Sequence, residues 1–146
     1  MKSIRIHSHG GPEVLSIDDI DKPKCTENKV LLKMEACALN HLDIWVREGL
    51  PGLPIKLPLI MGSDASGKVI EIGKNIKNTN VGDEVVVQPG TFDLNCDKSR
   101  NGLENYSSTY GILGETSNGT QAEYILLDEQ NISLKPRHLT HIEASS

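Results

Sequence analysis

Ten consecutive residues, NHLDIWVREG at positions 40–49, bring together several side chains that can do chemistry. The carboxamide of Asn40 can donate a hydrogen bond to an oxygen without changing its own protonation state. Asp43 and Arg47 stand four residues apart, the spacing at which a carboxylate and a guanidinium meet on one helix face. Such a pair can orient Asn40 or each other, or it can be a surface pair worth only about 0.3 kcal/mol. The residues alone leave both interpretations open.

Two aromatic residues follow Asn40 in the same segment. His41 can relay a proton or cap the turn from strand to helix, and we favour the cap. Trp45 is the single tryptophan of the chain, and it has helical spacing with Leu42 and Val46. Packing in the core is therefore the preferred role of Trp45, with a wall of a substrate cleft as the second.

The remaining histidines and the cysteines do not have the spacing of a metal site. These histidines lack a third donor nearby, and we expect them to be solvated at the surface: His7, His9, His138 and His141. The cysteines are odd in number, widely spaced and without a preceding export signal, so we expect reduced thiols: Cys25, Cys37 and Cys96.

Short β-rich runs make up the rest of the framework. Each is bounded by Gly, Pro, Asn or Asp, and the runs are SIRIH, EVLSI, KVLLKME, GKVIEIG, DEVVVQ and AEYILL. Because no helical patterns alternate with them, they favour a mainly β fold, a sandwich or a partly open barrel. The continuous apolar run in DEVVVQ predicts a strand that is buried on both faces.

One helix and one long loop interrupt the strands. The periodicity of residues 40–49 predicts a short helix near 41–48, with Gly49 as its C-cap. Residues 91–118 show little periodicity and many turn formers, and they predict an irregular lobe.

Charge and hydropathy restrict the partners. The chain holds 15 Lys and Arg against 20 Asp and Glu, a net charge of -5 that repels phosphate backbones. No apolar run approaches the ~18 residues of a membrane span, and the first residues lack a signal-peptide core. We therefore expect a cytoplasmic protein that binds neither nucleic acid nor a membrane.

The spacing of glycines in GSDASGKVIEIGKNI, residues 62–76, matches the pattern GHExxGxxxxxGxxI. On this segment, and on HGGPEVL, VGDEVVVQPG and GTQAEYILLDEQNISLKP, the chain resembles the medium-chain dehydrogenase/reductase superfamily over nearly its whole length. The resemblance implies the N-terminal, substrate-side domain of that superfamily, a mainly β, GroES-like partly open barrel with short helices and a lobe loop. No GxGxxG phosphate loop is present, so the cofactor must bind elsewhere.

The resemblance also bears on zinc. Asn40 and Ser63 stand where zinc-dependent members place a catalytic Cys and His, and Asp64 stands at the neighbouring Glu. Neutral oxygens are weak replacements for a thiolate and an imidazole, so we expect no catalytic zinc. The four places of the structural zinc site also lack three of their four thiolates, and they are Asp93, Cys96, Ser99 and Ser107. We expect the lobe to be mobile or held by its own hydrogen bonds.

Zinc-less members include quinone oxidoreductases and enone reductases, whose pattern NxxDxxxRxG is similar to Asn40, Asp43, Arg47 and Gly49. A quinone or enone is already electrophilic, so hydrogen-bond donors suffice where a simple carbonyl needs a Lewis acid. The resemblance implies a zinc-independent oxidoreductase that uses NADPH or, second, NADH on quinones, enones or aldehydes and alcohols. It assigns catalytic roles to the three polar residues of that pattern and places four others in the cleft: His41, Trp45, Ser63 and Asp64.

Thr140 and Glu143 near the end of the chain have the spacing of a capping box that opens a helix. We expect the polypeptide to continue into a Rossmann domain that supplies the cofactor site and the contacts of a homo-oligomer, so residues 1–146 alone should be inactive. The alternative is a non-catalytic GroES-like binding or assembly module, since a fold does not dictate a function.

Overall fold

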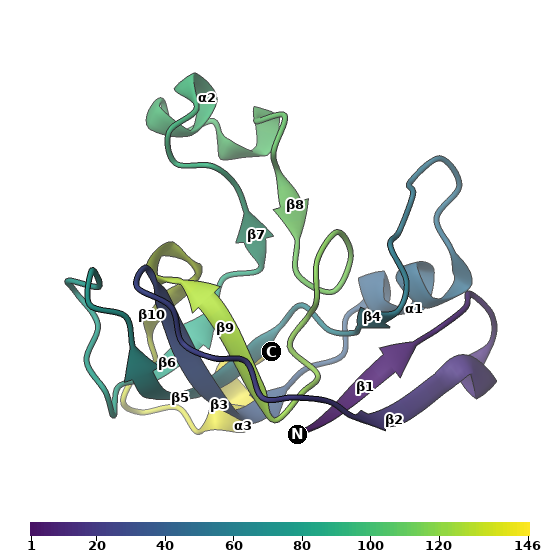
Figure 1. Ribbon diagram of the computed structural model, residues 1–146, viewed down its shortest axis with the longest axis horizontal. Coiled ribbons are helices and arrows are strands. Elements are labelled where there is room, and N and C mark those ends of the chain that lie inside the picture. Colours follow the sequence, from purple (N-terminus) through teal and green to yellow (C-terminus); the bar gives the residue numbers. More distant parts are fainter.

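A computed structural model describes residues 1–146, and its elements form two antiparallel sheets with a lobe between them (Figure 1). The five-stranded sheet has the order β10-β6-β5-β3-β9. Its strands are β3 (Lys29–Cys37), β5 (Ala65–Ile72), β6 (Glu84–Val87), β9 (Tyr124–Asp128) and β10 (Ile132–Leu134). The register of β3 against β5 shifts twice, between Leu31 and Leu32 and between Met34 and Ala36. Such bulges bend a strand, and the sheet curls into the half-barrel of the expected mainly β, GroES-like fold.

The smaller sheet has the order β2-β1-β4 and carries the helix that holds the candidate site. Its strands are β1 (Lys2–Ile6), β2 (Leu15–Asp19) and β4 (Leu59–Ile60), with a 3-10 turn, η1 (Pro12–Val14), before β2. Helix α1 (His41–Glu48) packs on this sheet through a buried cluster of Ile6, Val46, Leu59 and Met61. The predicted helix at 41–48 is therefore confirmed, and Gly49 ends it with a φ of 95°.

The core of the five-stranded sheet consists of nine buried residues, most of them from β3, β5, β6 and β9. Strand β6 does not follow the prediction for DEVVVQ, because Val85 and Val87 are buried while Val86 is only partly covered. The apolar run is continuous, but β6 lies between β5 and β10, and only one face of this sheet meets the core.

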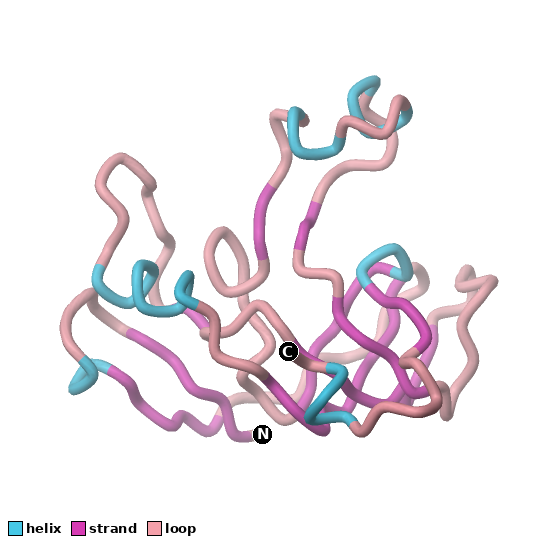
Figure 2. The backbone as a smooth tube through the Cα atoms, turned by 180° about the vertical axis from the view of Figure 1, so that it is seen from behind, coloured by secondary structure: helices cyan, strands magenta, loops and turns pink.

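The predicted irregular lobe rises from the middle of the molecule and stands clear of both sheets (Figure 2). A short ribbon of β7 (Gly90–Thr91) and β8 (Gly111–Ile112) forms its stem, and its tip contains two single turns, α2 (Asp97–Arg100) and η2 (Glu104–Tyr106). The lobe thus contains more regular structure than its sequence predicts.

The chain ends in η3 (Glu129–Asn131), β10 and a helical turn, α3 (His141–Ala144). The capping box predicted for α3 is confirmed: Thr140 Oγ1 accepts from the backbone N–H of Glu143, and Glu143 Oε2 accepts from that of Thr140. His9 is exposed, as predicted, and its ring Nδ1 contacts the carbonyl of Val46 at 3.0 Å. His141 is partly buried, contrary to the prediction, and its Nδ1 contacts Ser66 Oγ at 3.0 Å.

Three glycines allow two segments to cross beside the candidate site. Gly119 donates its N–H to the carbonyl of Ile60 at 2.9 Å, and Thr120 donates to that of Gly62 at 2.9 Å. A side chain on Gly119 or Gly114 would collide with the backbone of Gly62. This crossing fixes the path of the residues that follow β4.

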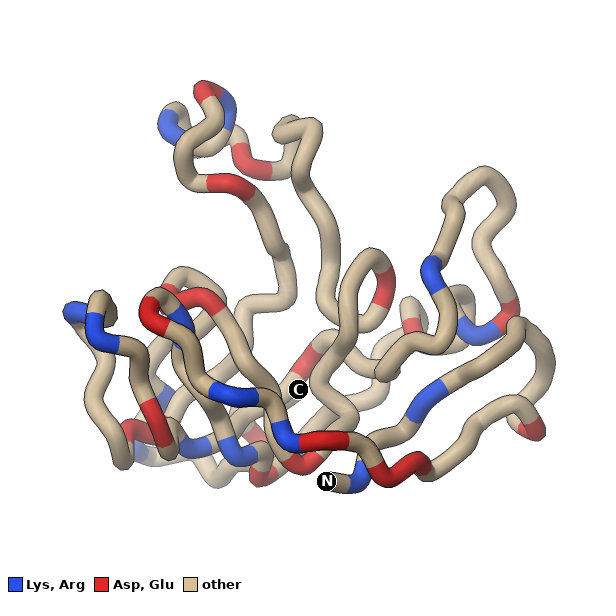
Figure 3. Tube along the Cα trace, in the orientation of Figure 1, with Lys and Arg blue, Asp and Glu red and all other residues tan.

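No helix in the structure combines the length and the apolar character needed to cross a bilayer. Basic and acidic residues alternate along the trace without a long stretch of one sign (Figure 3). None of the three cysteines is in a disulfide.

Candidate active site

Asn40 is the N-cap of α1 and takes part in a capping box. Its Oδ1 accepts from the backbone N–H of Leu42 at 3.1 Å, and Asp43 Oδ2 accepts from the backbone N–H of Asn40 at 2.8 Å. Its backbone is extended, as an N-cap requires. The cap that we assigned to His41 belongs to Asn40 instead, because His41 is already the first residue of the helix.

The carboxamide of Asn40 also reaches across to the segment after β4. Its Nδ2 donates to Asp64 Oδ2 at 2.9 Å, and no other protein group accepts from Nδ2. Asn40 is exposed, so its second amide hydrogen is open to a ligand. The structure therefore brings together two of the predicted site residues that lie 24 positions apart.

Asp43 is buried below this contact, with only 8% of its surface exposed. Its carboxylate accepts from the backbone N–H groups of Asn40 and Gly62, which fastens the start of α1 to the chain just before Ser63. Burial raises the pKa of the Asp43 carboxyl, and the charge of Asp64 adds to the rise. Asp43 thus supports the site from beneath and does not face a ligand.

The raised pKa of Asp43 predicts a pH-dependent stability. Its folded-state pKa lies above the ordinary 3.8, so its stabilising contribution is complete below the unfolded-state pKa and is lost as the pH rises through the folded-state pKa. Asp43→Asn removes this titration. We expect the free energy of unfolding of the wild type, minus that of the variant, to decrease in urea titrations as the pH rises above about 4, the ordinary pKa of an aspartate. A constant difference would contradict the assignment.

Arg47 does not pair with Asp43, contrary to both interpretations of their spacing. Its Nη1 donates to the carbonyl of Gly10 at 2.6 Å, and its Nη2 contacts Glu48 at 3.2 Å. The helix turns Arg47 toward the loop after β1, where it ties α1 to the smaller sheet. These contacts anchor Arg47 to the loop after β1, and a catalytic role for Arg47 stays a prediction.

Trp45 is half exposed, at 50%, and does not pack in the core as we expected. Its ring meets the ring of His41 edge to face, with centroids 4.7 Å apart. Val46 fills the core position instead. The rings of His41 and Trp45 therefore form an exposed aromatic surface on α1, the helix that Asn40 caps. A role of Trp45 as a wall of the substrate cleft remains a prediction.

The donors at the place of a catalytic zinc do not fit that metal. Ser63 is buried and donates its hydroxyl to the carbonyl of Leu113 at 2.8 Å, and the oxygen of Asn40 is occupied by the helix N-terminus. Only Asp64 offers a carboxylate. Nowhere in the structure do three or more His, Cys, Asp or Glu side chains gather as a metal site would require.

The four places of a structural zinc are replaced by a hydrogen-bonded cluster in the lobe. Cys96 Sγ lies 3.0 Å from Ser99 Oγ and 3.3 Å from Ser107 Oγ, and Asp93 receives the backbone N–H of Asn95 at 2.8 Å. The hydroxyl of Ser107, followed by that of Ser99, lowers the pKa of the Cys96 thiol. One thiol with two hydroxyls does not fit a closed zinc site, and the lobe is held by its own hydrogen bonds.

Cys37 is a neighbour of the site that the sequence did not single out. It ends β3, and its thiol donates to the carbonyl of Thr120 at 3.1 Å. Burial raises the pKa of Cys37, and the charge of Asp43 contributes. A sequence signal existed, since Cys37 lies only three residues before Asn40 at the end of a strand.

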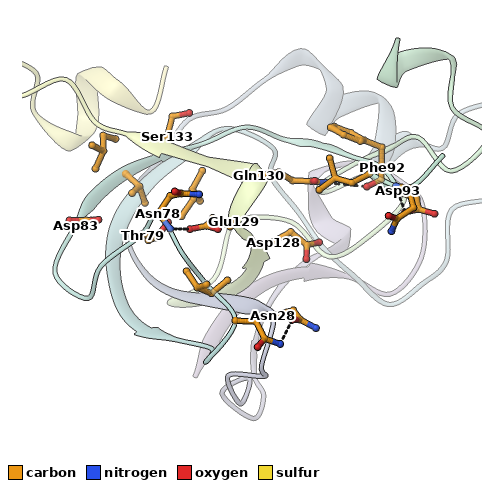
Figure 4. A pocket seen from close by; sticks show the side chains of 17 residues that line it. Asn28, Asn78, Thr79, Asp83, Phe92, Asp93, Asp128, Glu129, Gln130 and Ser133 are labelled. Carbon is orange, nitrogen blue, oxygen red and sulfur yellow. Dashed lines mark hydrogen bonds between the residues drawn. The ribbon is translucent and has the colours of Figure 1, made fainter. Parts of the chain in front are cut away.

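A hollow lies away from Asn40 and Asp64, between the lobe stem, the loop after β5 and η3 (Figure 4). It measures about 850 Å³ and contains several carboxylates. Glu129 accepts from the backbone N–H of Asn78 at 2.7 Å, Asp83 accepts from that of Asn80, and Asp128 pairs with Lys29. These carboxylates already have partners within the chain, whereas Asn40 keeps an amide hydrogen without an acceptor, and we place the candidate site at Asn40.

Comparison with known proteins identifies the domain. A family model described as the alcohol dehydrogenase GroES-like domain matches residues 26–137, most of the chain. The chain is an alcohol dehydrogenase GroES-like domain. This GroES-like domain belongs to the medium-chain dehydrogenase/reductase superfamily, as its glycine spacing predicted.

Relatives of the GroES-like domain are dehydrogenases and reductases. An NAD-dependent alcohol dehydrogenase of Sulfolobus acidocaldarius is 31% identical over 150 residues, which cover 99% of this chain and 43% of the relative. A crotonyl-CoA carboxylase/reductase of Cereibacter sphaeroides is 34% identical over 98% of this chain and 35% of its own length. A crystal structure of an NAD-dependent alcohol dehydrogenase superposes with a TM-score of 0.92 at 41% identity, over 99% of this chain and 42% of that one. The chain thus spans less than half the length of these relatives.

Proposed function

We propose that this GroES-like domain is the substrate-side part of a zinc-independent oxidoreductase that reduces enones or quinones with NADPH or NADH. One observation carries the proposal: the carboxamide of Asn40 is fixed at both ends, and one N–H remains exposed. The relatives' names support an oxidoreductase in general terms. The cofactor would bind outside residues 1–146, because this chain has no glycine-rich phosphate loop at a helix start.

The chemistry assigned to the chain is electrostatic. When bound, a nicotinamide cofactor would supply the hydride that reduces the distal carbon of the conjugated system. The electron pair of the double bond moves toward the carbonyl, whose oxygen becomes negative, and a proton later completes the reduction. Asn40 donates its free N–H to that oxygen and gives up no proton, so it stabilises the charge without titrating. This donor needs no metal because the substrate is already activated by conjugation.

The proposal is tested by assaying the intact protein for oxidation of NADPH and NADH with a panel of enones, quinones and simple aldehydes. We expect turnover with the conjugated substrates. Turnover of simple alcohols and aldehydes only would contradict the proposed substrate class. No turnover with any combination of cofactor and substrate would favour the alternative, a non-catalytic assembly module.

Zinc independence is tested separately. Purified protein is expected to contain far less than one zinc per domain, and incubation with a chelator should leave its melting temperature unchanged, because both zinc positions lack the required thiolates and imidazoles. Elemental analysis and thermal melts measure the two quantities. Stoichiometric zinc would show that other residues provide the ligands.

A further inference from the structure

We propose that Asp64 is a positioning and specificity-determining residue, which makes Asn40 an obligate hydrogen-bond donor and disfavours substrates that carry a negative charge beside the reacting carbonyl. This inference rests on the proposed function of Asn40. It assigns a task to a carboxylate that forms no ion pair and does not belong to a cluster of three or more candidate metal ligands.

The Asn40 carboxamide could in principle take two orientations that differ by a 180° rotation. In the observed orientation, Oδ1 faces the N–H of Leu42 and Nδ2 faces Asp64 Oδ2. A rotation of the amide by 180° would place Oδ1 against the carboxylate and Nδ2 against the N–H of Leu42. Both contacts would then be repulsive, oxygen to oxygen and donor to donor. Asp64 and the helix N-terminus together therefore exclude the flipped form.

The carboxamide of Asn40 can therefore donate a hydrogen bond to a ligand but cannot accept one. The oxygen and one hydrogen of the carboxamide are used inside the protein, and only the second N–H is available to a ligand. Without Asp64, the cap contact to Leu42 would be the sole restraint, and the amide could rotate away from the substrate. Asp64 thus acts on the substrate oxygen through Asn40.

Two hydrogen bonds to its backbone carbonyl hold Asp64 in place. The backbone carbonyl of Asp64 accepts from the N–H of Ala38 at 3.0 Å and from the hydroxyl of Thr120 at 3.5 Å. These contacts join it to the end of β3 and to the glycine crossing, which are rigid parts of the domain. The side chain of Asp64 is half-buried. The surrounding residues therefore set its position, and its negative charge still acts on groups at the surface.

The carboxylate of Asp64 also places a negative charge beside Asn40. Asp64 forms no ion pair, and Arg47, the basic residue of α1, is directed to Gly10. The carboxylate of Asp43 lies on the protein side of the same cluster and interacts with that of Asp64. A substrate with its own carboxylate beside the carbonyl would meet this uncompensated charge, and like charges close together are a common basis of discrimination. A neutral carbonyl meets only the N–H of Asn40.

The test is a double-mutant cycle in the intact protein, with a neutral enone and with an enone that carries a carboxylate next to its carbonyl. Asp64→Ala should lower kcat for the neutral enone by about 10-fold, the lower end of the loss for a misplaced oxyanion donor. In the Asn40→Ala background the same change should alter kcat by less than about twofold, because the residue through which Asp64 acts is absent.

The conservative variant separates position from charge. Asp64→Asn keeps an oxygen that accepts from Asn40 and removes the charge, so kcat for the neutral enone should stay within about threefold of the wild type. The ratio of kcat/KM for the anionic enone to that for the neutral one should rise by about 10-fold. Glu35→Gln, an exposed carboxylate of β3 outside this cluster, should change neither value.

The outcomes distinguish the two proposals. If Asn40→Ala leaves kcat unchanged, the proposed role of Asn40 is wrong. If Asn40→Ala lowers kcat but Asp64→Ala has no effect, or has the same effect in both backgrounds, Asp64 does not act through Asn40 and the positioning role is wrong. An unchanged substrate ratio in Asp64→Asn would overturn the specificity role alone.

Discussion

Replacing Asn40 with alanine in the intact protein is expected to lower turnover of an enone or quinone by about 10- to 1000-fold, the range for loss of one donor to a developing oxyanion. One N–H of the Asn40 carboxamide has no acceptor in the protein and is open to a ligand. The dissociation constant of the nicotinamide cofactor should barely change, because the chain has no phosphate-binding loop near this residue. Steady-state kinetics and cofactor titration measure the two quantities.

A matched variant is needed because Asn40 also caps α1. Loss of an N-cap costs about 1 kcal/mol of stability, so Asn40→Ala should unfold at a lower denaturant concentration. Serine is a comparable cap but is too short to replace the carboxamide donor. Asn40→Ser should therefore keep the stability and lose the turnover. Full activity in a correctly folded Asn40→Ala would show that the residue is a cap and nothing more.

Replacing Gly119 with alanine is expected to lower the free energy of unfolding by about 3 kcal/mol, because the added methyl group has no space. Its Cβ would collide with the carbonyl oxygens of Gly62 and Met61 and with the backbone of Gly114. All three obstacles are main chain and cannot swing aside as a flexible side chain would. The segment of Gly119 and the segment of Gly62 would move apart, and the residues Ser63 and Asp64 would shift with the latter.

Gly11→Ala is the matched control for this prediction. Gly11 has a φ of −73°, which any residue adopts, and the nearest obstacle to a Cβ is the exposed carboxylate of Glu13, which can move aside by giving up its hydrogen bond to the N–H of Gly11. Its free energy of unfolding should change by less than about 0.5 kcal/mol. Chemical denaturation of the two variants gives the comparison, and a Gly119→Ala protein as stable as Gly11→Ala would mean that the two segments can move apart at little cost.

The limits of α1 and the start of α3 were predictable because the signals that set them are local. Asn40 and Gly49 act on backbone groups within one turn of themselves, and so do Thr140 and Glu143. The strands were also predictable where apolar runs end in turn residues. The pairing of those strands was not, since β3 lies between β5 and β9, whose residues are far away in the chain.

The direction of each side chain on α1 shows why the site was only partly predictable. Trp45 and Val46 are both apolar, but neighbouring residues on a helix point about 100° apart, so one contact surface cannot bury both. The smaller sheet selects Val46, and Trp45 is left half exposed. Arg47 has the spacing to meet Asp43, but its guanidinium donates to the carbonyl of Gly10 instead. A helix of two turns carries no information about which side the sheet will cover.

The sequence by itself determined the residue types at the site, and with them the lack of a thiolate and an imidazole at the catalytic zinc position and of three of the four thiolates at the structural one, because donor chemistry depends on composition and spacing. It also determined the family, through glycines whose spacing marks close backbone contacts. Only the tertiary structure decided that Asn40 meets Asp64, that Asp43 lies beneath them and that Cys96 joins two serines. The physical reason is that these contacts join segments brought together by sheet pairing and by the glycine crossing, and no local pattern encodes the distance between two such segments.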